Sequence, residues 1–123
     1  MEARRIAACI RGESGMKKIF VMLPPEKLST EERMSEYMRK REELCHRAEL
    51  KLKEYCEVSY YRPYRLEEYD RGDEYVRRGF VRDNLEQLLD SDYAVFGEGC
   101  AENEECRLVR HVAEAYGVQI LED

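Results

Sequence analysis

The sequence lacks three features that would place it at once in a common class: a long apolar run, a paired-cysteine motif and an excess of basic residues. No apolar run approaches the roughly 18 residues of a membrane-spanning helix, so we expect no membrane partner. Lysine and arginine total 21 against 27 acidic residues, and the resulting charge of −6 repels a phosphate backbone. We therefore expect no nucleic-acid partner.

The five cysteines form an odd set without a C-x-x-C pair: Cys9, Cys45, Cys56, Cys100 and Cys106. No long apolar stretch of the secretory type stands at the start of the chain, so we expect a reducing, cytoplasmic compartment. The spacings between Cys100, Cys106 and His111 match no common zinc pattern. We expect neither a metal nor another cofactor.

The length of 123 residues corresponds to one domain. Residues 6–10 form a short apolar run between arginines, and residues 12–15 (GESG) have the composition of a flexible joint. We therefore expect residues 1–15 to be a flexible N-terminal extension, followed by a single domain over residues 16–123.

Four β-prone apolar runs alternate with three amphipathic stretches. The predicted strands cover residues 19–23, 56–60, 93–96 and 118–121. Ser29 with Glu32 places one helix start near Thr30, and Asp73 and Asn103 cap the other two helices. Such alternation predicts an α/β fold, a small flavodoxin/Rossmann-like three-layer sandwich with a four-stranded parallel sheet.

Open parallel sheets bind ligands beyond the carboxyl ends of their strands, at the point where the strand order reverses. This rule selects residues 22–26, 60–64, 96–103 and the helix start at 103–107. The polar and aromatic groups there suit a nucleoside or a small phosphorylated ligand, and they include Tyr60, Tyr61, Arg62, Tyr64, Glu98, Cys100, Glu104 and Glu105.

Residues 80–96 (FVRDNLEQLLDSDYAVF), 106–108 (CRL) and 113–117 (AEAYG) resemble a family of small phage and bacterial proteins. These proteins have the nucleoside 2-deoxyribosyltransferase-like fold, and many are domains of unknown function. In the enzymes of this fold, a glutamate on the last helix attacks the anomeric carbon of the sugar and forms a covalent intermediate. The resemblance places that glutamate three residues after Cys106 and four before Ala113, where this chain has Val109.

Other positions also depart from the family pattern. Cys100 stands where tryptophan is usual, Asn103 where serine is usual, and Glu105 where glycine lets a ligand approach the backbone. Asn84 replaces an aspartate that often reaches the ligand, and Leu23 with Pro24 replaces the Gly-Pro that follows the first strand in many relatives. The resemblance thus implies a retained crevice without its nucleophile, and favours a protein that is not an enzyme.

We expect a non-catalytic protein that binds a nucleoside or nucleotide-like small molecule. The expected ligand-binding residues are Leu23, Pro24, Tyr61, Arg62, Asn84, Glu98, Gly99, Cys100, Asn103 and Glu105. One alternative is an active N-glycosidase or deoxyribosyltransferase in which Glu105 or Glu104 replaces the lost nucleophile. A second is a protein-interaction module. A sheet of only four strands leaves one flank uncovered, so we also expect a homodimer or higher homo-oligomer.

Overall fold

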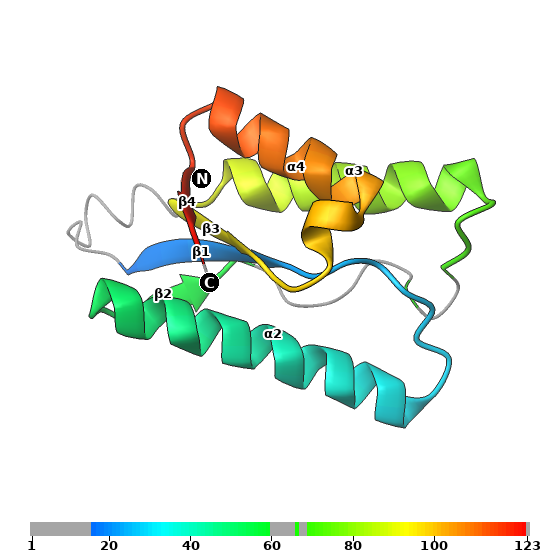
Figure 1. Cartoon of the computed structure of the whole chain (residues 1–123), viewed down its shortest axis with the longest axis horizontal. Coiled ribbons are helices and arrows are strands. Elements are labelled where there is room, and N and C mark those ends of the chain that lie inside the picture. Colours follow the sequence, from blue (N-terminus) through cyan, green and yellow to red (C-terminus); the bar gives the residue numbers. More distant parts are fainter. Residues whose placement is uncertain (1–15, 60–65, 67–68, 123) are drawn as a thin grey trace.

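The computed structural model describes residues 16–59, 66 and 69–122 (Figure 1). The expected extension 1–15 and the candidate residues Tyr61 and Arg62 lie outside these residues. Eight elements follow one another along the chain: β1 (Lys17–Met22), α2 (Glu31–Leu52), β2 (Cys56–Val58), α3 (Glu74–Leu89), β3 (Tyr93–Phe96), the short 3₁₀ helix η2 (Cys100–Glu102), α4 (Glu104–Ala115) and β4 (Gln119–Leu121).

The four strands form one parallel sheet in the order β2-β1-β3-β4. Helix α2 covers one face, and α3 and α4 lie together over the other (Figure 1). This arrangement confirms the predicted α/β three-layer sandwich of the flavodoxin/Rossmann-like type. The strand order reverses between β1 and β3, so the switch point lies beyond Met22 and Phe96.

Strand β1 lies at the centre of the sheet, because its apolar run is buried on both faces. It pairs with β3 over its last four residues but with β2 only as far as Ile19. Among the described residues, no strand residue donates to the carbonyl of Val21 on the β2 side. The buried Arg41 of α2 donates to it from Nη2 at 3.1 Å.

Side-chain caps fix the helix starts close to the predicted positions. Asp73 accepts from the amides of Tyr75 and Val76, and Asn103 accepts from the amide of Cys106, as the sequence predicts. The prediction for α2 was one residue early, because Thr30 rather than Ser29 accepts from the Arg33 amide.

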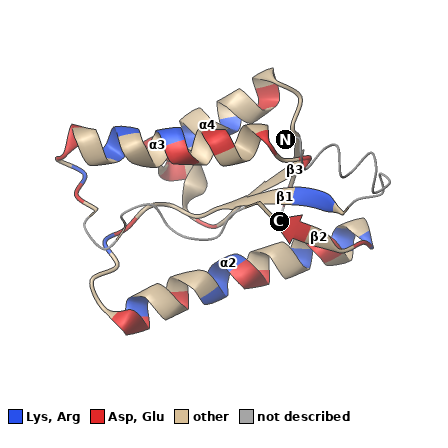
Figure 2. Cartoon of the chain, turned by 180° about the vertical axis from the view of Figure 1, so that it is seen from behind, with Lys and Arg blue, Asp and Glu red and all other residues tan. Residues whose placement is uncertain are grey.

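Charged residues of both signs occupy the outer faces of the helices (Figure 2). The inner face of α2 is apolar apart from Arg41, with Tyr37, Leu44, Cys45 and Ala48 buried. Within the described part of the chain, no helix combines the length and the apolarity needed to cross a membrane.

Candidate functional site

The chain itself closes the switch point between β1 and β3. The Gly97 amide donates to the Met22 carbonyl at 2.9 Å, and the Tyr37 hydroxyl donates to the Leu23 carbonyl at 3.3 Å. Leu23 is 9% exposed and packs so closely that a Cβ on Gly97 would lie 2.5 Å from its Cδ2. Pro24 lies similarly near Gly99, which has a φ of +91°. Leu23 and Pro24 are thus placed within this closure.

Four apolar and aromatic side chains pack together near the carboxyl end of β1. The Leu28 amide donates to the Leu66 carbonyl at 2.8 Å. Tyr69 meets Phe80 of α3 edge to face, with ring centroids 6.0 Å apart. All four side chains are buried in the core.

An open cavity of about 720 Å³ lies instead beyond the carboxyl end of β3, and we call it the β3 cavity. Helix η2, one face of α4 and the residue after β4 enclose it. Its volume is within the range typical of small-molecule sites. The residues that line it are Phe96, Gly97, Glu98, Cys100, Ala101, Cys106, Arg107, Arg110 and Glu122.

Two guanidinium groups and two carboxylates surround the apolar floor of the β3 cavity. Arg110 lies over the Phe96 ring at 5.7 Å and pairs with Glu122 at 2.7 Å. Arg107, one turn earlier on α4, is exposed, as is Glu98 in the turn after β3. The cavity therefore offers both strong donors and a strong acceptor near one aromatic ring.

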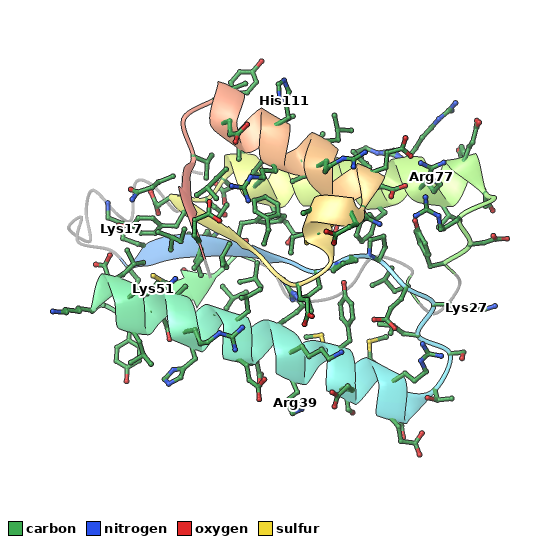
Figure 3. The ribbon with its side chains drawn as sticks, viewed as in Figure 1. Lys17, Lys27, Arg39, Lys51, Arg77 and His111 are labelled. Carbon is green, nitrogen blue, oxygen red and sulfur yellow. The ribbon has the colours of Figure 1, made fainter. Side chains whose placement is uncertain are left out.

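Two cysteines form part of the floor. Cys100 donates from Sγ to the Met22 carbonyl at 3.4 Å. Cys106 is hydrogen-bonded to Cys100, and this bond, together with burial, raises the pKa of the Cys106 thiol. His111, which the sequence analysis considered with them as a metal ligand, points outward from α4 (Figure 3). Among the described residues, no group of three or more His, Cys, Asp or Glu side chains could hold a metal ion.

Glu104 and Glu105 lie on a different face of α4, away from the β3 cavity. They line a groove of about 820 Å³ between α3 and α4, whose floor is apolar. Glu105 is 3% exposed and accepts from Arg77 Nε at 2.5 Å, while Arg71 lies 3.7 Å from its other oxygen. Arg77 also pairs with Glu104 at 2.9 Å (Figure 3).

The charge of Glu105 also acts on the nearby phenol of Tyr69. Burial first, and then this charge, raise the pKa of Tyr69. The carboxylate of Glu105 is therefore part of a buried cluster that ties the start of α3 to the start of α4, and it does not share a cavity with Glu98 or Cys100.

Three further positions from the sequence analysis have structural partners. Val109 is 0% exposed and belongs to the core. Asn84 is buried and donates from Nδ2 to the Phe80 carbonyl at 2.8 Å, within α3. Asn103 caps α4. None of the three lines the β3 cavity.

Arg107 ends the predicted ligand-binding range 103–107 but is not among the candidate residues, and Arg110 and Glu122 lie outside every predicted range. The three-residue spacing of the two arginines, on a helix that follows a buried strand and a glycine turn, is the one local signal for them. The contribution of Glu122 depends on the position of β4 beside β3 and has no local signal.

Comparisons with family models, with curated proteins and with solved structures find no match to this chain. The resemblance of residues 80–117 to the nucleoside 2-deoxyribosyltransferase-like family thus remains a prediction from the sequence.

Proposed function

We propose that this protein binds a nucleotide-like small molecule in the β3 cavity without cleaving it. The observation that carries the proposal is the meeting of Arg107, Arg110, Glu98 and Phe96 around a cavity of about 720 Å³. This cavity lies beyond the carboxyl end of β3, at the end of the strands where open α/β sheets bind their ligands.

Each part of the cavity matches one part of such a ligand. Arginine side chains bind phosphate oxygens through charge-assisted hydrogen bonds, so Arg107 and Arg110 suit the phosphate. The carboxylate of Glu98 accepts hydrogen bonds from sugar hydroxyls or from an exocyclic amino group. Phe96 and the backbone of Gly97 provide a surface for the flat base.

The hydrocarbon at position 109, where the family pattern has its carboxylate, supports binding without chemistry. Cleavage of an N-glycosidic bond by this route needs a carboxylate directed at the anomeric carbon. Val109 is a hydrocarbon side chain inside the core, and Glu105 is engaged by Arg77 on another face of α4. A carboxylate held about one helical turn away is far outside the roughly 1 Å tolerance of catalytic positioning.

Thermal unfolding with a panel of deoxynucleosides and nucleoside monophosphates tests the binding. A ligand present at 100 times its Kd should add about 2.7 kcal/mol to the free energy of unfolding. Arg107→Ala should weaken binding of a monophosphate about tenfold or more, because a charge-assisted hydrogen bond contributes about 1.5–3 kcal/mol. Arg82→Ala removes an exposed arginine of α3 outside the cavity and should leave binding unchanged.

If no panel member raises the temperature of unfolding, the proposal is contradicted. Chromatography of the same mixtures should find every N-glycosidic bond intact. Release of free base that disappears in Glu105→Ala would instead establish the alternative function, a glycosidase or deoxyribosyltransferase.

A further inference from the structure

The floor of the β3 cavity contains two buried thiols, Cys100 and Cys106. Cys100 begins η2, and Cys106 lies in the first turns of α4, six residues later. Asn103 joins the two residues, because its amide donates to the Cys100 carbonyl at 3.1 Å and its side chain accepts from the Cys106 amide at 2.9 Å. Cys100 is 5% exposed and Cys106 is 1% exposed, so the cavity is their route to small solutes. A disulfide between them needs an S–S distance of about 2.05 Å.

We propose that Cys100 and Cys106 form a reversible disulfide when the protein meets a peroxide, which makes the floor of the β3 cavity a site of oxidative modification. The site is independent of the proposed ligand, because it consists of the protein's own sulfur atoms. A peroxide is the fitting oxidant, since it is small enough to enter a cavity of about 720 Å³ beside buried thiols.

The reaction proceeds in two balanced steps. Cys100 gives up the proton that it donates to the Met22 carbonyl, and its sulfur attacks one oxygen of hydrogen peroxide; the O–O bond breaks, hydroxide leaves and takes up that proton as water, and Cys100 becomes a sulfenic acid. The sulfur of Cys106 then attacks the sulfur of Cys100; the S–O bond breaks and a second water leaves with the Cys106 proton. Overall, two thiols lose two protons and two electrons, and one peroxide is reduced to two waters.

The contacts of the two thiols give the order of the steps. Cys106 retains its proton, because its hydrogen bond to Cys100 and its burial both raise its pKa. Cys100 carries the first oxidation, and Cys106, in the same cavity floor, resolves it. The sulfur that donates to the Met22 carbonyl gives up this hydrogen bond as the disulfide forms.

Cys45 and Cys56 provide a matched control within the same chain. Both are buried, on α2 and at the start of β2, and burial raises the pKa of each thiol to about 11. Neither lines the β3 cavity. They therefore share the burial of Cys100 and Cys106 but not the cavity.

Mass spectrometry of the full-length protein tests the proposal. Tryptic cleavage places Cys100 and Cys106 together in peptide 83–107, Cys45 in 42–47 and Cys56 in 54–65, because the bond before Pro63 is not cut. After treatment with hydrogen peroxide, denaturation and alkylation, peptide 83–107 should lack two hydrogens and carry no alkyl group. The other two peptides should be fully alkylated, and dithiothreitol should restore both thiols in 83–107.

The peroxide dose is chosen so that it fully oxidises added glutathione. If peptide 83–107 then still carries two alkyl groups, both thiols have stayed reduced and the proposal is overturned. A disulfide that joins this peptide to another would overturn it too. In Cys106→Ser, a dimedone adduct should appear on Cys100, because the sulfenic acid has no resolving thiol. In Cys100→Ser, Cys106 should remain a thiol, and equal oxidation of Cys106 there would contradict the order of steps.

Discussion

Position 109 is the residue on which the proposal of binding without cleavage depends. Its valine side chain is fully buried, so Val109→Glu would place a carboxylate in the core without a partner. We expect this change to lower the free energy of unfolding by about 3–5 kcal/mol without producing release of free base. Urea denaturation and the nucleoside assay measure the two effects.

Val109→Ala is the matched control, because it removes the same contacts without adding charge. Its cost should be about 2 kcal/mol. If the glutamate variant were as stable as the wild type, position 109 would have to face a solvated site.

Asp83 is a residue whose environment makes stability depend on pH. Burial, followed by the charge of Glu86, raises its pKa, while a hydrogen bond from Gln87 and the charge of Arg41 oppose the shift. A raised pKa in the folded state means that the ionised carboxylate costs stability above the ordinary aspartate pKa of about 3.9.

Asp83→Asn should therefore be more stable than the wild type at pH 7. The difference should shrink as the pH falls through the raised pKa, and vanish below about 3.9. Denaturation curves of both proteins between neutral and acid pH measure this difference. A difference that grows as the pH falls would show that the hydrogen bond from Gln87 outweighs burial.

At the scale of elements, the junction of β1 and β3 depends on the absence of a side chain at Gly97. A Cβ there would lie 2.5 Å from Leu23 Cδ2 and 3.1 Å from Leu44 Cδ2. Gly97→Ala should thus cost about 1–3 kcal/mol. The double variant with Leu23→Ala should lose less than the sum of the single losses, because the smaller residue removes the clash.

Gly72→Ala is the control for this experiment, since its Cβ would lie at an ordinary 3.4 Å from the nearest atom and its φ is not in the left-handed region. It should change the free energy of unfolding by less than about 0.5 kcal/mol. Additive losses at Gly97 and Leu23 would exclude a direct clash between the two positions.

Helices α3 and α4 are joined by ion pairs of very different burial that share Arg77. Arg77→Ala leaves the buried Glu105 without its main partner and should cost about 3–5 kcal/mol. Glu104→Ala removes the exposed pair with the same arginine and should cost less than about 1 kcal/mol. Thermal unfolding distinguishes these values, and equal losses would mean that Glu105 is solvated in solution.

At the scale of the whole molecule, the charge of −6 is spread over helix faces that carry both signs (Figure 2). Proteins that bind nucleic acids usually carry clustered lysines and arginines, which displace counterions from the phosphates. The described helix faces mix both signs of charge instead. The protein should not retard duplex DNA in a gel at about 0.15 M salt. Retardation that weakens as salt is added would contradict this expectation.

Much of the fold was predictable because its signals are local. Apolar runs identified all four strands, although β2 ends at Val58 rather than at residue 60. Asp73 and Asn103 marked two helix starts correctly, since a cap acts on amides two or three residues away. At the site, Glu98, Cys100 and the glycine turn were identifiable as residues that follow a buried strand.

The sequence by itself determined the alternation of strands and helices, the parallel sheet and the hydrocarbon at position 109, because periodicity, caps and residue identity do not depend on distant contacts. Only the tertiary structure decided that Glu105 faces Arg77, that Leu23 closes the switch point, and that the open cavity lies beside Arg107 and Arg110. The physical reason is that a side chain's neighbours depend on which face of its helix packs against the sheet and on which strands lie side by side. Segments far apart in the chain fix both together.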